Sequence, residues 1–251
     1  MKRRVFGEQA WFVPPLYLME DGARDFKEFK QNGADAFQRF LSFGLKRTDR
    51  ILDIGSGIGR KTLPLLEYLT TGSYEGIDPI PKQVRWCQER ITSRYPNFRF
   101  QAVDVWSKHY NPAGKIKPSE YRFPFNDAEF DFIIMGSVFT HMFPRDVDHY
   151  ISEISRVFKA GGRGWITFLL LNEESTASIA AGRSTINLIH EVGDGSQADN
   201  RNRYETAIGH REQGVLRMFA QHNIHAEVAE YGSWSGRESG YYQDIVKITK
   251  N

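Results

Sequence analysis

Three acidic residues are placed to do chemistry in the first half of this 251-residue chain. Asp53 lies inside a short apolar segment, and Asp78 and Asp104 each follow the next such segments along the chain. An acid at the end of the second strand is placed to bind ribose hydroxyls, and one at the end of the third can accept from an exocyclic amine. One such acid alone would be read as a helix cap, but three together favour a ligand site.

A glycine loop, Gly55-Ser-Gly-Ile-Gly59, follows Asp53. Glycine allows a tight turn and lets a ligand touch the backbone. A dinucleotide fingerprint would place its third glycine at position 60, where this chain has Arg60. Asp53 would also repel a pyrophosphate. The loop therefore predicts contacts with a ligand through Gly55, Gly57 and Gly59, and it disfavours an NAD(P) oxidoreductase.

Two histidines are candidates for a general base, because the unperturbed pKa of histidine is about 6.5. His141 ends the run Ser137-Val-Phe-Thr-His141, and His210 ends a variable region. The alternative for His141 is a hydrogen bond to the backbone that shapes its loop, and His190 is a weaker candidate. No His, Cys and Asp cluster has the spacing of metal ligands, so the chain is predicted to be metal-independent.

The elements that must position these residues alternate between strand and helix patterns. Apolar runs predict five strands at 50–54, 73–77, 98–103, 130–135 and 164–171. Helical spacing of apolar residues lies between them, and one such helix should begin at Pro144 and end at Gly161-Gly162. Strand and helix repeated in this way predict a parallel sheet covered by helices on both faces.

Two regions depart from that alternation. Residues 1–48 carry a helical stripe of phenylalanines and are expected to form a helical cap on a core of residues 49–251. Gly33 falls on that stripe, where it serves either close helix packing or close approach to a ligand. Residues 172–210 are rich in Ser, Gly and Asn and are expected to form a substrate-side insertion or lid.

The end of the chain predicts a helix at about 211–222, followed by strands at 224–231 and 243–249 that pair antiparallel. The segment between these strands contains Gly232-Ser-Trp-Ser-Gly-Arg237. Trp234 and Arg237 either line a substrate pocket or form a turn in which Trp234 packs on the edge of the sheet.

Composition excludes several classes of protein. Lys plus Arg is 33 and Asp plus Glu is 31, a balance that argues against a nucleic-acid partner bound through bulk charge. The apolar run 165–171 is too short to span a bilayer. Cys87 is the single cysteine, which favours a reducing, cytoplasmic location. The basic segment Met1–Gly7 is not followed by the apolar stretch of a secretory leader.

Together these motifs resemble those of the class I S-adenosylmethionine-dependent methyltransferases, and within them the bacterial small-molecule group of type 11 or type 25. The resemblance rests on five segments: LDIGSGIGR at 52–60, YEGIDP at 74–79, VDV at 103–105, FDFIIMGSVFTHM at 130–142 and FKAGGRGWIT at 158–167. It implies an α/β, Rossmann-like fold whose seven-stranded, mostly parallel sheet has the order 3-2-1-4-5-7-6.

The resemblance also implies the cofactor, S-adenosyl-L-methionine, with S-adenosyl-L-homocysteine as its product. Gly136 and Ser137 would close over the methionine part, Asp78 would take the ribose hydroxyls, and Ile80 (or Pro79) would lie against adenine. Four more residues would lie along the methionine part: Asp53, Gly55, Gly57 and Gly59.

On the adenine side, Asp104 would meet the exocyclic amine and Val105 would offer its backbone. The insertion 107–124, which contains His109 and Tyr110, departs from the family pattern. It would shape the adenine side or reach the substrate.

The function implied is in-line transfer of a methyl group to a small-molecule acceptor, preferably a hydroxyl of a sugar or natural product. N- or C-methylation, and a catalytically silent protein that binds the cofactor, are the alternatives. The sequence Gly136-Ser-Val-Phe139 does not match the N/D-P-P-Y motif of enzymes that methylate DNA amines. The protein is expected to be a monomer or a homodimer without nucleic-acid or membrane partners.

Overall fold

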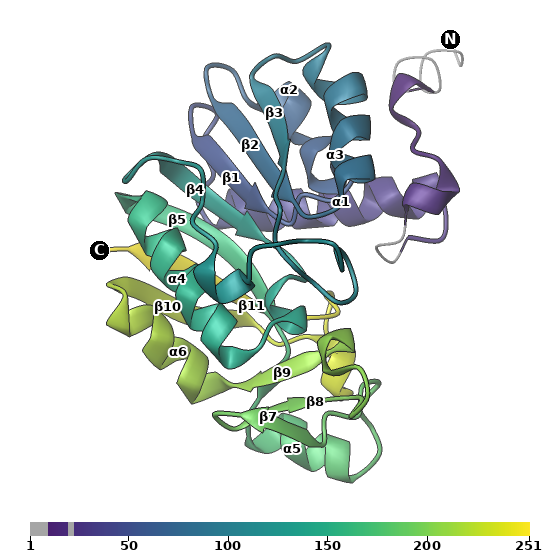
Figure 1. The fold of residues 1–251 in the computed structure, drawn as a ribbon, viewed down its shortest axis with the longest axis vertical. Helices are drawn as coiled ribbons and strands as arrows, with labels where there is room; N and C mark the ends of the chain where they lie inside the picture. The colour runs from purple at the N-terminus through teal and green to yellow at the C-terminus, as the bar shows by residue number, and fades with distance from the viewer. Residues whose placement is uncertain (1–9, 20–22) are drawn as a thin grey trace. The chain divides into compact units, whose positions relative to one another are not determined.

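The computed structural model describes residues 10–19 and 23–251 (Figure 1). The chain divides into two compact units, one ending at Val103 and one running from Asp104 to Asn251. The expected boundary between residues 48 and 49 stays a prediction. The segment Met1–Gly7, for which a secretory leader was not expected, lies outside the described residues.

Seven strands form one sheet of order β10-β11-β5-β4-β1-β2-β3. Read from β3 and renumbered within the sheet, this is the predicted order 3-2-1-4-5-7-6. The strands are β1 Arg50–Ile54, β2 Ser73–Asp78, β3 Phe98–Ala102, β4 Phe130–Met135, β5 Phe158–Phe168, β10 Ile224–Glu230 and β11 Asp244–Lys250. The pairs β1–β2, β2–β3 and β4–β5 are parallel. β11 runs antiparallel to both β5 and β10, which confirms the antiparallel pair predicted at the end of the chain.

In the first unit, helix α1 (Phe26–Ser42) begins at Asp25, whose side chain accepts a hydrogen bond from the Glu28 N–H. Its buried face contains Gly33, and a Cβ there would lie 2.5 Å from the carbonyl oxygen of Arg60. The helix backbone therefore packs directly on the turn that follows the glycine loop. Of the two explanations for Gly33, close helix packing is the correct one.

The turn after the glycine loop is a 3₁₀ turn, Arg60–Thr62. Helix α2 (Leu65–Tyr68) begins only after Pro64, because proline has no N–H to continue a helix and is tolerated only at its start. Helix α3 begins at Pro81 in the same way and ends at Cys87, followed by the π-helical turn Gln88–Thr92.

In the second unit, helix α4 (Pro144–Val157) begins at Pro144 and buries its apolar face, as predicted. It ends before the glycine pair Gly161-Gly162, where its end was expected. β5 begins at Phe158 and runs through Gly161 and Gly162. Phe158 pairs with Phe130 of β4 and is buried, which draws the chain into the sheet four residues early. Helix α6 (Glu212–Gln221) lies close to its expected range and packs on α4 (Figure 1).

The composition of residues 172–210 suggested an irregular region, but these residues form regular helices and strands (Figure 1). Helix α5 (Glu173–Ala180) starts with a capping box formed by Asn172 and Ser175. A second sheet has the order β6-β9-β8-β7. Its strands are β6 Leu170–Leu171, β7 His190–Gly193, β8 Ser196–Ala198 and β9 Ile208–Arg211. Backbone hydrogen bonds between these strands therefore give the region a regular structure that its composition does not indicate. Within the described ranges, no helix has the length and apolar character of a membrane span.

Candidate functional site

The glycine loop turns through three left-handed residues. Gly55, Gly57 and Gly59 have φ values of 75°, 55° and 76°, which disfavour any residue with a side chain. The Gly55 N–H donates to the Ile77 carbonyl at 2.9 Å, which ties the loop to the end of β2. The loop thus presents bare backbone beside the carboxyl end of β1.

Asp78 holds this loop to the start of α3. One of its carboxylate oxygens accepts the Gly57 N–H and the other accepts the Ile80 N–H, both at 2.8 Å. Both donors are backbone N–H groups, and the two contacts orient the carboxylate. An oriented carboxylate at the carboxyl end of β2 fits the two hydroxyls of a ribose.

Asp53 is fully buried and contacts two protein groups. The Tyr74 hydroxyl donates to its Oδ2 at 2.6 Å, and the Lys61 ammonium lies 3.1 Å from its Oδ1. Burial raises the pKa of Asp53, while Lys61 and Tyr74 act in the opposite direction. Lys61 also donates to the Gly55 carbonyl at 3.2 Å, so the Asp53–Lys61 pair supports the glycine loop. Neither Lys61 nor Tyr74 could be recognised from the sequence as a partner of Asp53, because neither lies in the glycine-loop segment 52–60.

Asp104 is an exposed residue that the insertion after it contacts. The N–H of Lys115 donates to its Oδ1 at 3.3 Å, and the N–H of Ile116 donates to its carbonyl at 3.0 Å. Val105 pairs with Ile116, and its carbonyl accepts from the Asn111 amide at 3.0 Å. The first part of the insertion 107–124 therefore folds back on Asp104 and Val105.

Ser137 follows Gly136 at the end of β4 with φ 59°, a left-handed conformation that is uncommon for serine. Its N–H donates to the Thr167 hydroxyl at 2.8 Å, and its own hydroxyl donates to the Gln243 side-chain oxygen at 3.0 Å. Two side chains, from β5 and from the residue before β11, hold this strained loop in place.

Both ring nitrogens of His141 have defined neighbours. Nδ1 lies 2.9 Å from the Glu205 carbonyl, and Nε2 lies 3.2 Å from the Tyr110 hydroxyl. A carbonyl only accepts, so Nδ1 carries the proton in the neutral ring and Nε2 is the basic atom. Tyr110 belongs to the insertion 107–124, which therefore reaches the candidate base.

His210 lies in the core, only 2% exposed. Its Nε2 lies 2.9 Å from the Phe139 carbonyl, and its Nδ1 lies 3.0 Å from the Ser196 hydroxyl. Burial lowers its pKa to about 4, so the ring stays neutral and bridges β8 to the turn Phe139–His141. These contacts favour a positioning role for His210 over direct proton transfer.

This burial predicts a loss of stability in acid. An unfolded histidine binds a proton below about pH 6.5, whereas folded His210 resists protonation down to about pH 4. Stability should therefore fall between pH 6.5 and 4, by roughly 3 kcal/mol from this group. Urea unfolding at several pH values should show a flatter dependence for His210→Gln than for the wild type. The exposed-site control His225→Gln should keep the wild-type slope, and an unchanged slope in His210→Gln would contradict the assignment.

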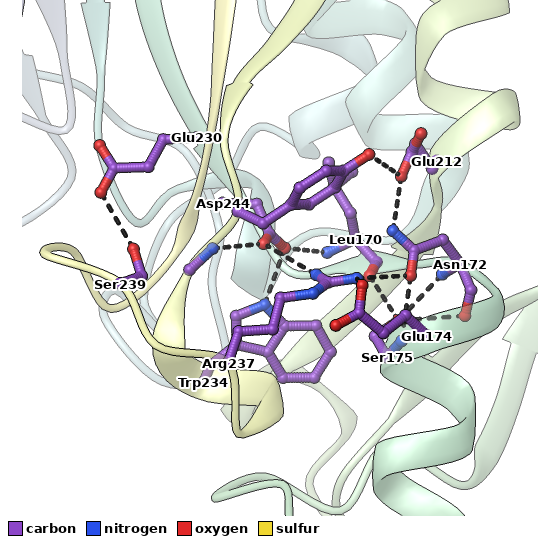
Figure 2. Close-up of polar contacts among 12 residues, drawn as sticks. Leu170, Asn172, Glu174, Ser175, Glu212, Glu230, Trp234, Arg237, Ser239 and Asp244 are labelled. Carbon is purple, nitrogen blue, oxygen red and sulfur yellow. Dashed lines mark hydrogen bonds and ion pairs between the residues drawn. The ribbon is translucent and has the colours of Figure 1, made fainter.

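The segment between β10 and β11 is organised around Asp244 (Figure 2). Its buried carboxylate accepts from the Leu170 N–H at 2.6 Å, the Gly232 N–H at 2.8 Å and the Trp234 indole at 2.7 Å. Trp234 is fully buried in a cluster with Leu169 and Leu188. Of the two roles considered for Trp234, packing is therefore supported over lining a substrate pocket, and the residues it packs with form a buried cluster.

Arg237 extends this network to helices α5 and α6 (Figure 2). Its guanidinium donates to the Asn172 oxygen at 2.9 Å, pairs with Glu174 at 3.0 Å and stacks 4.3 Å from the centre of the Tyr231 ring. Glu212 accepts from the Asn172 amide at 2.7 Å and from the Tyr231 hydroxyl at 3.0 Å. Arg237 thus links the 231–243 segment to the start of helix α5.

No group of three or more His, Cys, Asp or Glu side chains in residues 10–19 and 23–251 is arranged to hold a metal ion.

Comparison with known proteins shows a similarity over part of the chain. Residues 51–162 match the family model of a methyltransferase domain. An uncharacterised methyltransferase of Schizosaccharomyces pombe is 30% identical over 118 residues, which is 47% of this chain and 39% of that protein. The chain thus matches about two fifths of the length of this relative.

Solved structures share the fold at low identity. The PH0226 protein of Pyrococcus horikoshii superposes with a TM-score of 0.61 at 15% identity, covering 93% of this chain and 95% of that one. Magnesium protoporphyrin IX methyltransferase of Synechocystis, solved with bound S-adenosylhomocysteine, gives 0.58 at 15% identity, covering 94% and 92%. Residues 51–162 are thus similar to a methyltransferase domain, and the chain shares the fold of these solved structures.

Proposed function

We propose that this protein transfers a methyl group from S-adenosyl-L-methionine to a hydroxyl of a small molecule, such as a sugar or natural product. The observation that carries the cofactor assignment is the bare glycine loop tied to Asp78, with an oriented carboxylate at the end of β2. The family match at residues 51–162 supports the same cofactor.

The cofactor supplies an activated methyl group on a sulfonium, so the protein's work is to bind, orient and exclude water. In the first unit, Asp78 binds the ribose hydroxyls, Ile80 lies against adenine, and the loop glycines with Asp53 beneath them follow the methionine part. In the second unit, Gly136 and Ser137 serve the methionine side, and Asp104 with Val105 serves the adenine amine.

His141 is the general base of this proposal. The Glu205 carbonyl holds its Nδ1 proton, which leaves Nε2 to accept the proton of the acceptor hydroxyl. The Tyr110 hydroxyl now contacts Nε2 at 3.2 Å, so an acceptor must take its place there. His210, which contacts the Phe139 carbonyl, positions the turn that carries His141.

N-methylation and C-methylation remain second candidates, because a base beside the methyl donor also serves an amine or an acidic carbon. We propose a small-molecule partner rather than nucleic acid, given the near-neutral charge of +2. We further propose a cytoplasmic location, since Cys87 is the single cysteine and is buried. A monomer or homodimer is the proposed oligomeric state.

The proposal is tested by incubating the protein with methyl-labelled S-adenosylmethionine and a panel of alcohols, phenols, amines and activated methylenes. Transfer to oxygen acceptors, with one S-adenosylhomocysteine formed per methyl group, is the expected result. Transfer to nitrogen or carbon alone would correct the acceptor. Cofactor binding without any transfer would favour the catalytically silent alternative.

A further inference from the structure

Three polar side chains from separate elements meet at the carboxyl ends of β4 and β5. Ser137 follows β4, Thr167 lies near the end of β5, and Gln243 immediately precedes β11. Because β11 runs antiparallel to β5, with Asp244 opposite Phe168, its first residue lies at that same end. Ligands of open α/β sheets bind at the carboxyl ends of the strands. Gln243 is therefore at the functional edge of the sheet.

The orientation of the Gln243 amide follows from its two contacts. The Thr167 hydroxyl lies 2.6 Å and the Ser137 hydroxyl 3.0 Å from the side-chain oxygen. A separation of 2.6 Å is typical of O–H···O and short for N–H···O. Thr167 also accepts the Ser137 N–H, so its single proton is directed to Gln243. The oxygen faces the hydroxyls, and Nε2 with its two N–H groups faces away from them.

The backbone on both sides of Gln243 is fixed. The Trp234 N–H donates to the Tyr242 carbonyl at 3.0 Å, and the Asp244 carboxylate accepts the three hydrogen bonds described above (Figure 2). Among the contacts of the described residues, Nε2 makes no hydrogen bond. The half-buried amide is thus a rigidly held donor whose N–H groups have no hydrogen-bond partner among the described residues.

We propose that Gln243 is a substrate-binding residue whose Nε2 donates to an oxygen of the acceptor molecule. This inference rests on the proposed function. A donor on the reacting oxygen itself would weaken that nucleophile, so Nε2 suits a second oxygen. Ser137, which Gln243 contacts, lies four positions before His141, the proposed base. The preferred acceptors are accordingly diols, such as catechols or vicinal sugar diols, rather than isolated hydroxyls.

The test is Gln243→Glu, which keeps an oxygen for Ser137 and Thr167 but has no N–H donor. Catechol is compared with phenol, and methyl glucoside with cyclohexanol, as acceptors. The wild type should prefer the diols by about 10- to 100-fold in kcat/KM, and Gln243→Glu should lose that preference. Gln221→Glu, the same change on an exposed helix position, should keep it. An unchanged preference in Gln243→Glu would overturn the inference.

A second readout needs binding rather than turnover. In ¹⁵N-labelled protein saturated with S-adenosylhomocysteine, millimolar catechol or methyl glucoside should shift the Gln243 side-chain NH₂ resonance downfield, and phenol and cyclohexanol should not. If neither diol moves that resonance, Gln243 is only a tie between the loops. Failure of the wild type to bind S-adenosylhomocysteine at all would instead contradict the proposed function, and the inference with it.

Discussion

Replacement of His141 by alanine is expected to lower kcat by about 10²–10⁴-fold, the range for loss of a general base. The reason is that Nε2 is the basic atom of a ring held by the Glu205 carbonyl at 2.9 Å. Binding of S-adenosylhomocysteine should change little, since His141 acts on the acceptor. The measurement is the rate of methyl transfer to the best hydroxyl acceptor, together with a calorimetric titration.

Two controls separate a base from a loop-shaping residue. His225→Ala, on an exposed position of β10, should keep wild-type turnover. Tyr110→Phe, which removes only the hydroxyl that contacts Nε2, should leave most of the activity. Added imidazole should restore part of the rate to His141→Ala. A loss of activity of only about fivefold in His141→Ala would be much smaller than the loss expected for a general base and would contradict that role.

Asp244→Ala is expected to lower the free energy of unfolding by about 3–5 kcal/mol. The substitution leaves three buried donors without their acceptor: the N–H groups of Leu170 and Gly232 and the indole of Trp234. It also removes a carboxylate 4.0 Å from the largely buried Arg237 guanidinium. Urea unfolding monitored by tryptophan fluorescence would measure the change.

A matched substitution on the neighbouring strand gives the scale for this effect. Glu227 of β10 pairs with Lys247 of β11 at 3.0 Å, but both side chains are exposed. Removing such a pair changes stability by about 1 kcal/mol or less. If Asp244→Ala were no more destabilising than Glu227→Ala, Asp244 would not be the centre of the segment between β10 and β11.

The central strand β4 could be predicted because it is a nearly continuous apolar run. Phe130–Met135 is buried along almost its whole length, and such runs are typical of parallel strands covered on both sides. The end of α4 was mispredicted for a related reason. A glycine pair usually ends a helix, but the pairing of Phe158 with β4 outweighed that local signal.

The residues that surround the candidate site were harder to predict. Lys61 and Tyr74 support the glycine loop through buried contacts with Asp53, which the spacing of residues along the chain does not encode. Tyr110 and Gln243 lie outside the five segments that carry the family resemblance. Tertiary packing brings Tyr110 to His141 and Gln243 to Ser137. The small sheet of β6, β7, β8 and β9 likewise depends on pairing between strands of two to four residues, which are too short for a recognisable sequence pattern.

The most direct test of the cofactor assignment is calorimetric titration of the wild type and Asp78→Ala with S-adenosylhomocysteine, with the exposed Glu67→Ala as control. The wild type and Glu67→Ala should bind with micromolar affinity. Asp78→Ala should bind about 30-fold more weakly or worse, because the ribose hydroxyls lose a charged acceptor. Equal affinity in the wild type and Asp78→Ala, or no binding to the wild type, would contradict the account.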